Sequence, residues 1–140
     1  MSLKKHIMLI DDNKIDLFVS QQTIHNLDSK ILVSMFSSSV SAFRYFENLD
    51  HQASPDSCEL PDLIFLDINM PEMNGFQLLE RFNSMDLFKK FFIEIVMLSS
   101  SKNDYDINKS KNNGLCSNYI TKPLTKEKLE RILCEASKIQ

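Results

Sequence analysis

The sequence predicts one α/β domain built on a doubly wound parallel sheet of five strands, and two observations carry this prediction. Short apolar runs of strand length recur along the chain, and segments whose apolar residues recur at helical spacing separate them. Strands joined through helices pair in parallel, and right-handed crossovers then place helices on both faces of an open sheet. The 140 residues, 43% of them hydrophobic, suffice for one core. We therefore expect residues 1–140 to form a single domain.

The strand predictions rest on the apolar runs. The runs, which end before polar residues or turn formers, cover residues 6–10, 31–36, 63–66, 93–98 and 118–120. The third run is the most informative, because its four consecutive apolar residues are typical of a strand that is buried on both faces. Pro71 and Gly75 follow this run and mark a structured loop. We expect this strand to be central in the sheet.

The helix predictions rest on caps and on apolar spacing. The expected N-caps are Asp12 or Asn13 for a helix that runs to about Leu27, the serines 37–39 for the second helix, and Thr125 for the last. The residues expected to face inward are Ile15, Phe18 and Val19; Ala42, Phe43, Phe46 and Leu49; Leu78, Leu79 and Phe82 after Gly75; and Leu129, Ile132, Leu133 and Ala136. Leu124 and Leu129 are spaced as a hydrophobic staple around the last cap.

Three polar segments connect these elements. Residues 51–61 contain two prolines and are expected to form a surface loop. Residues 84–91 are compatible with a short helical piece or with a loop. The segment 102–113 is polar and weakly patterned, and Gly114 is expected to act as its C′ glycine.

Composition excludes several classes of protein. The net charge of −3 argues against a general binder of nucleic acid or of anionic membranes, because no basic excess is available to neutralise phosphates. No apolar run is long enough to cross a bilayer, and the amino terminus does not have the pattern of a secretory signal. The three cysteines match no zinc spacing and no disulfide framework. We therefore expect reduced thiols and a cytoplasmic location.

Polar side chains follow four of the predicted strands. Asp11 and Asp12 follow the first strand, Asp67 the third, Ser99 the fourth, and Lys122 comes just after the fifth. The carboxyl ends of parallel strands meet at one edge of the sheet, so we expect these side chains to converge in one crevice. Close carboxylates repel one another unless a cation lies among them, and oxygen ligands select a hard ion such as Mg²⁺.

A metal ion, a lysine and a hydroxyl together are suited to stabilise a phosphoryl group during transfer. A carboxylate can itself be the nucleophile and form an aspartyl phosphate. Asp67 is our candidate for this role, because it is the lone acid at the end of a central strand.

The chain resembles a receiver domain of a two-component response regulator over essentially its whole length. The residues that carry the resemblance are Asp11, Asp12, Asp67, Pro71, Gly75, Ser99 and the Lys122-Pro123 pair. The resemblance implies a flavodoxin-like sheet with the strand order 2-1-3-4-5. It also implies that Asp12 and Asp67 bind Mg²⁺ directly with the backbone carbonyl of Asn69, and that Asp11 acts mainly through a bound water.

The resemblance implies further roles around the phosphoacceptor. Lys122 would pair with the phosphoryl oxygens, and the backbone amides of Asn69 and Ser100 would help to hold them. Ser99 would act as the switch hydroxyl and Tyr119 as the switch aromatic. Their rearrangement on phosphorylation would change the face made by the fourth helix, the fifth strand and the fifth helix. The side chains of Asn69 and Ser101 would tune autodephosphorylation. The polar insertion at 51–61 resembles regulators that accompany phytochrome-type kinases.

The implied function is that of a phosphoacceptor in a phosphorelay rather than that of an enzyme with an external substrate. A sensor histidine kinase or a histidine phosphotransfer protein would phosphorylate Asp67, and the chain would then bind an output protein or pass the phosphoryl group on. Because the chain ends with its fifth major helix, we expect no attached output domain, no direct contact with nucleic acid or membrane, and a monomer or weak dimer.

Two other functions share part of this pattern. A phosphatase of the haloacid dehalogenase type also uses a strand-end aspartate, a hydroxyl, a lysine and Mg²⁺, but it needs a second acid two residues after the nucleophile. That position is Asn69, which cannot shuttle protons. A docking module that works without phosphorylation would be expected to have a degenerate site, whereas all the key residues are present here.

Overall fold

The computed structural model describes residues 4–52 and 59–139, without the side chains from residue 135 onward. Its strands are β1 (His6–Ile10), β2 (Leu32–Phe36), β3 (Leu63–Leu66), β4 (Glu94–Ser99) and β5 (Cys116–Thr121). They form one parallel sheet in the order β2-β1-β3-β4-β5, which confirms the predicted fold class and strand order. The strands begin and end within about two residues of the predicted bounds.

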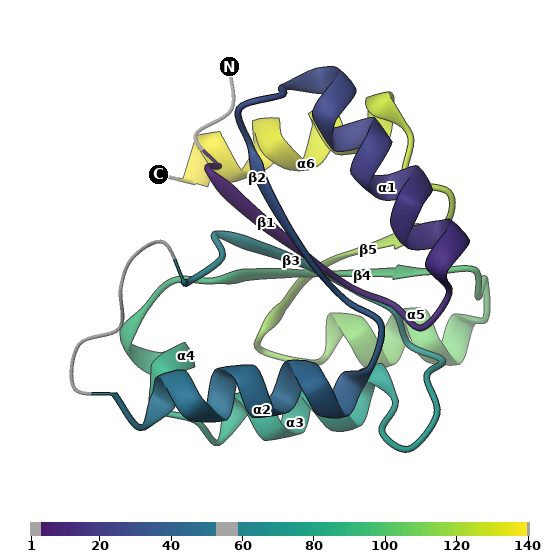
Figure 1. Ribbon diagram of the computed structural model, residues 1–140. Coiled ribbons are helices and arrows are strands. Elements are labelled where there is room, and N and C mark those ends of the chain that lie inside the picture. The colour runs from purple at the N-terminus through teal and green to yellow at the C-terminus, as the bar shows by residue number, and fades with distance from the viewer. Residues whose placement is uncertain (1–3, 53–58, 140) are drawn as a thin grey trace.

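Helices cover both faces of this sheet (Figure 1). The helices are α1 (Lys14–Leu27), α2 (Ser39–Asp50), α3 (Gly75–Asn83), α4 (Leu87–Lys90), α5 (Asp104–Lys111) and α6 (Lys126–Ile139). Figure 1 shows α1 and α6 on one face, and α2, α3, α4 and α5 on the other. The segment 84–91, for which sequence left two possibilities open, therefore contains a short helix.

Each face has its own hydrophobic core, because successive side chains of a strand point to opposite sides. In β1, Ile7 and Leu9 pack beneath α1 and α6, whereas Met8 and Ile10 pack with α2 and α3. All four side chains are at most 2% exposed. The central strands are therefore apolar throughout because both of their faces are covered.

Most of the predicted caps and inner faces are confirmed. Asn13 caps α1, one of the serines (Ser38) caps α2, and the hydroxyl of Thr125 accepts a hydrogen bond at the start of α6. The predicted inward residues of α2, α3 and α6 are buried, apart from Phe43, which is partly exposed, and Ala136, which lies outside the described side chains. Of the predicted loop 51–61, residues 53–58 also lie outside the described part.

The predicted inner face of α1 is wrong. Ile15 and Phe18 are 73% and 60% exposed, and Val19 is 38% exposed. The helix instead buries Leu17, Ser20 and Ile24, which lie on the opposite side of the helix. Two apolar stripes compete in this helix, and the contacts of α1 with the sheet and with α6 decide between them.

The predicted role of Gly114 is also wrong. Helix α5 ends at Lys111, and Asn112 is its C-cap with right-handed backbone angles. Neither glycine of the chain has a positive φ, so Gly114 does not close the helix in the left-handed conformation that a C′ glycine adopts. The segment up to Cys116 turns instead through backbone hydrogen bonds that Asn113 accepts and donates.

Candidate functional site

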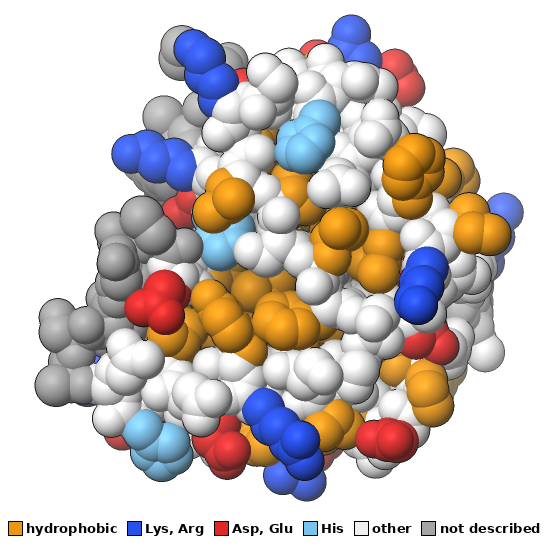
Figure 2. Space-filling model, in the orientation of Figure 1, with side chains coloured by type: hydrophobic (Ala, Val, Ile, Leu, Met, Phe, Trp, Pro, Cys, Tyr) orange, Lys and Arg blue, Asp and Glu red, His pale blue; other side chains and the backbone are white. Residues whose placement is uncertain are grey.

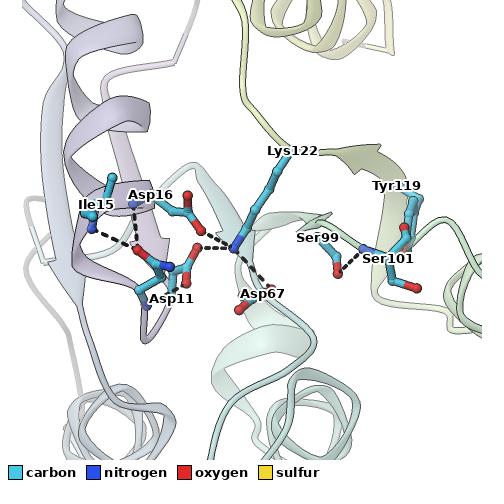
Figure 3. Close-up of polar contacts among 9 residues, drawn as sticks. Asp11, Ile15, Asp16, Asp67, Ser99, Ser101, Tyr119 and Lys122 are labelled. Atoms are coloured by element: carbon cyan, nitrogen blue, oxygen red, sulfur yellow. Dashed lines mark hydrogen bonds and ion pairs between the residues drawn. The ribbon is translucent and has the colours of Figure 1, made fainter.

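The strand ends bring the predicted site residues to one edge of the sheet (Figure 3). Asp67 follows β3 and is fixed beside β1, because its backbone N–H donates to the carbonyl of Ile10 at 2.9 Å. Lys122 follows β5 and is fixed beside β4 in the same way, since its backbone N–H donates to the carbonyl of Ser99 at 2.9 Å. Residues that are far apart in the sequence therefore meet because their strands are parallel and in register.

Asp11, Asp12 and Asp67 form a group of carboxylates. One oxygen from each lies within 4.8 Å of the others. Asp11 and Asp67 are 6% and 5% exposed, whereas Asp12 is exposed at the rim. One oxygen of Asp11 accepts a hydrogen bond from the backbone N–H of Asn13 at 2.9 Å, which orients this carboxylate at the start of α1.

Lys122 extends its ammonium group into this acidic cluster. Its Nζ lies 2.7 Å from a carboxylate oxygen of Asp11, 2.8 Å from one of Asp16 and 3.5 Å from one of Asp67. Sequence reasoning missed Asp16. It stands in the first turn of α1, where any acidic side chain is favoured by the helix dipole, so its position alone did not mark it as part of the site.

The acidic cluster shifts the pKa of its central carboxyl group. The pKa of Asp67 is raised from its ordinary value of 3.8 to about 7. Burial is the largest cause, the neighbouring charge of Asp11 is the next, and the charge of Lys122 acts in the opposite direction. Burial alone would lower the pKa of Lys122. Its hydrogen bonds to Asp11 and Asp16 and the charge of Asp67 outweigh burial, so the net shift of this pKa is upward and the ammonium stays charged.

These shifts predict how the stability of the metal-free protein depends on pH. The folded-state pKa of Asp67 lies above that of the unfolded chain, so its contribution to stability is full below about pH 4 and is lost as the pH rises through about 7. Asp67→Asn has no carboxyl group to ionise at this position, so it is expected to be more stable than the wild type near pH 8. Urea unfolding in the presence of a chelator measures the difference in the free energy of unfolding. If this difference does not shrink on acidification to about pH 4, the raised pKa of Asp67 is not its cause.

The donor set fits a hard divalent cation. The group consists of carboxylates alone, which are the ligands that Mg²⁺ prefers. Burial is the main cause of the raised pKa of Asp67, and the charge of Asp11 raises it further, so a cation bound among these carboxylates would favour the ionised form of Asp67. Asn69 is exposed in the loop that follows, two residues after Asp67, and its role as a ligand stays a prediction.

Ser99 and Tyr119 are connected through Ser101. Ser99 is fully buried at the end of β4, and its hydroxyl accepts a hydrogen bond from the backbone N–H of Ser101 at 3.2 Å. The hydroxyl of Tyr119 donates to the backbone carbonyl of Ser101 at 2.7 Å, and the hydroxyl of Ser101 donates to Asp106 in α5 at 2.8 Å. Figure 3 shows Ser99, Ser101 and Tyr119 on the opposite side of Asp67 from Asp11. Ser101 therefore links the end of β4, beside the carboxylate group, to β5 and α5.

Gly75 allows α3 to begin in close contact with the backbone of Asp67, which follows β3. Its backbone N–H donates to the carbonyl of Ile68 at 2.8 Å, and a Cβ at this position would lie 2.3 Å from the backbone oxygen of Asp67. The preceding Asn74 forms a capping box with Gln77, which starts the helix at this point. The glycine is needed for close approach, because a side chain would collide with the backbone that carries Asp67.

Comparison with known proteins identifies the family. A model of the response regulator receiver domain matches residues 7–133. The chain belongs to this family. Among curated relatives, Protein PilG of Pseudomonas aeruginosa is 30% identical over 123 residues, which cover 88% of this chain and 80% of PilG. Chemotaxis protein CheY1 of Helicobacter pylori strain 26695 is 30% identical over 76% of this chain and 91% of its own length.

Solved structures agree with this assignment. A two-component response regulator from Cytophaga hutchinsonii superposes with a TM-score of 0.76 at 26% identity, covering 96% of this chain and 98% of that one. The phosphorylated cyanobacterial phytochrome response regulator RcpA superposes with a TM-score of 0.72 at 30% identity, covering 96% and 91% of the two chains. The chain is thus a receiver domain of the two-component type.

Receiver domains are phosphoacceptor signalling modules and are generally not enzymes. They interact with histidine kinases or phosphotransfer proteins and with output partners, and they bind Mg²⁺ at an acidic pocket, for which this chain has the group of three aspartates. Among the residues that the structure describes, no helix combines the length and the apolar character that crossing a membrane requires.

Proposed function

We propose that Asp67 accepts a phosphoryl group from a phosphohistidine of a sensor histidine kinase or a histidine phosphotransfer protein. One carboxylate oxygen of Asp67 attacks phosphorus, the P–N bond to the donor imidazole breaks, and the imidazole keeps the electron pair. The observation that supports this role is the position of Asp67, which lies within 4.8 Å of two further carboxylates and 3.5 Å from the ammonium of Lys122.

The neighbouring residues divide the work of binding and charge compensation. Asp11, Asp12 and Asp67, together with the backbone carbonyl of Asn69, would hold Mg²⁺, which when bound supplies positive charge for the phosphoryl oxygens. Lys122 supplies a second positive charge beside Asp67, and its contacts with Asp11 and Asp16 keep the ammonium within this group of carboxylates. The side chain of Asn69 cannot act as a general acid or base, which favours a phosphoacceptor over a phosphatase with rapid turnover.

The response to phosphorylation would pass through the Ser99–Ser101–Tyr119 connection. Movement of the Ser99 hydroxyl toward the phosphoryl group removes the acceptor of the Ser101 N–H, and the Tyr119 hydroxyl is bound to the carbonyl of that same residue. The packing of Tyr119 would then shift between two populations. A groove lined by α5, β5 and α6, including Tyr119, is our candidate face for the output protein.

The test of this function is phosphorylation by acetyl phosphate in the presence of Mg²⁺. The wild type is expected to gain one phosphoryl group, stable in acid and labile in base, and Asp67→Asn is expected to gain none. Intact-mass spectrometry reads both results. Sustained release of phosphate from an aryl phosphate would instead indicate a phosphatase, and an unmodified wild type would indicate a docking module.

The exposed stripe of α1 is our candidate surface for docking of the phosphoryl donor. Ile15, Phe18 and Val19 on α1 and Met35 on β2 are exposed, and we call them the α1–β2 patch. Figure 2 shows hydrophobic side chains over this face, and Figure 3 places Ile15 beside Asp16 at the rim of the site. A partner helix that covered these side chains would bring its phosphohistidine close to Asp67.

Phe18→Ser is expected to slow phosphotransfer from a phosphorylated partner protein by about tenfold, because exposed aromatic anchors carry much of the binding energy in an interface. Phosphorylation by acetyl phosphate, which needs no docking surface, should stay within about twofold of the wild type. The matched control is Phe92→Ser, since Phe92 is 70% exposed but precedes β4, at the opposite edge of the sheet. Equal losses with both donors would contradict the docking assignment.

We also propose, on composition and family membership, that residues 1–140 act as one receiver domain in the cytoplasm, as a monomer or weak dimer without direct contact with nucleic acid or membrane. The net charge of −3 supports the lack of nucleic-acid binding, and the thiols of Cys116 and Cys134 are free; Cys58 lies outside the described residues. Light scattering before and after phosphorylation measures the oligomeric state.

A further inference from the structure

The ammonium of Lys122 is shared among three carboxylates, and the sharing is unequal. An ammonium group has three N–H donors. Its two short contacts, at 2.7 and 2.8 Å, go to Asp11 and Asp16, and the contact with Asp67 is 3.5 Å long. The lysine that should serve the phosphoacceptor is thus bound more closely by its neighbours than by Asp67 itself.

Asp11 and Asp16 differ in what else they bind. Both oxygens of Asp11 are engaged, one by the backbone N–H of Asn13 and the other by Lys122, and this carboxylate also belongs to the group that would bind a metal ion. The carboxylate of Asp16 is not part of that group, and its side chain is 36% exposed at the start of α1. Among the described residues, Lys122 is the partner that the structure gives to the carboxylate of Asp16.

We propose that Asp16 is a positioning residue that competes with the phosphoryl group for Lys122. In the unphosphorylated protein it compensates the charge of the ammonium and holds it at the start of α1. When Asp67 is phosphorylated, Lys122 must give up or lengthen its contact with Asp16 to serve the phosphoryl oxygens. This inference rests on the proposed function of Asp67 and adds a residue that sets the affinity of the site for a phosphoryl group.

The physical reason is charge. A phosphoryl group brings close to two negative charges, and a carboxylate in direct contact with the lysine both takes one of its donors and repels that group. Both effects favour the unphosphorylated state. Asp16→Asn removes the charge while it keeps the size of the side chain, so it is expected to strengthen binding of a phosphoryl-like anion about tenfold.

The experiment uses beryllium trifluoride, an anion that mimics a phosphoryl group on a carboxylate, with saturating Mg²⁺ and isothermal titration calorimetry. Asp16→Asn is expected to bind it about tenfold more tightly than the wild type, and Asp16→Glu is expected to stay closer to the wild type. Glu47→Gln is the matched control for net charge, since Glu47 is exposed on α2. The same gain in Glu47→Gln would overturn the proposal.

A Lys122→Met background tests whether Asp16 acts through the lysine. There, Asp16→Asn is expected to change the affinity by less than about twofold. A gain as large as in the wild-type background would mean general repulsion and would overturn the proposal. If the wild type binds the anion and Asp16→Asn binds it with the same affinity, the proposal for Asp16 is overturned, whereas the phosphoacceptor function is not. A wild type that does not bind the anion would overturn both.

A second measurement needs neither metal nor anion. The unfolding equilibrium constant is measured in the presence of a chelator for the wild type, Asp16→Asn, Lys122→Met and the double variant. When Lys122 is present, Asp16→Asn is expected to raise this constant about threefold or more, which means a less stable protein. When methionine replaces Lys122, Asp16→Asn is expected to leave the constant unchanged. Equal effects in the two backgrounds would show that the pair is not coupled and would overturn the proposal.

Discussion

Phosphorylation of Asp67 by acetyl phosphate is expected to become about 100-fold slower when Lys122 is replaced by methionine, because one preorganised charge beside a reacting group contributes about that factor. Methionine keeps an unbranched side chain of similar length, so packing of the stem is preserved. The structure places the Lys122 ammonium 3.5 Å from an Asp67 oxygen, at the end of a strand that the backbone hydrogen bond to Ser99 fixes. Intact-mass spectrometry over time gives the rate.

Lys126→Met provides the matched control for this result. Lys126 is an exposed residue at the start of α6, four positions after Lys122, and its loss removes the same charge from the protein. Its rate is expected to stay within about twofold of the wild type. If both variants slow equally, overall charge rather than the position of the ammonium governs the rate, and the assigned role of Lys122 is wrong.

Gly75→Ala is expected to destabilise the fold by about 3 kcal/mol, the upper part of the range for forcing extra volume into a packed interior. The new Cβ would lie 2.3 Å from the backbone oxygen of Asp67 and 3.0 Å from Cα of Ile68, and neither backbone atom can move without shifting β3 or α3. The better helix propensity of alanine, about 1 kcal/mol, offsets only part of this cost. Urea unfolding measures the change, and slower phosphorylation of the folded fraction is expected with it.

The other glycine of the chain supplies the comparison. A Cβ on Gly114 meets nothing within 4 Å, and its φ is not positive. Gly114→Ala is therefore expected to be neutral or to stabilise the protein by up to about 1 kcal/mol, through a less flexible unfolded chain. Equal stability of the two alanine variants would show that the close approach of α3 to Asp67 is not tight.

The sheet and the edge that carries the site could be predicted without coordinates because their signals are local. Four consecutive apolar residues before Asp67 indicate a strand covered on both faces, and parallel strands place all their carboxyl ends together. The positions of Asp11, Asp67 and Lys122 therefore followed from the order of the elements alone. The caps of α2 and α6 were likewise predicted from a hydroxyl placed just before a helical pattern.

Contacts between segments distant in sequence decided the rest. Helix α1 has two apolar stripes, and the choice of Leu17 and Ile24 over Ile15 and Phe18 depends on how the helix packs against the sheet and α6. The need for glycine at position 75 comes from the backbone oxygen of Asp67, at the end of the preceding strand. The missing acid, Asp16, reaches a lysine 106 positions away.

The residue pattern alone therefore specified the order of strands and helices, the family and the set of side chains at the site edge, because apolar periodicity and capping act over a few neighbouring residues. Only the folded arrangement specified which stripe of α1 stays exposed and which carboxylates share Lys122. Those choices depend on distances between side chains that no local pattern encodes, and here they add Asp16 to the site.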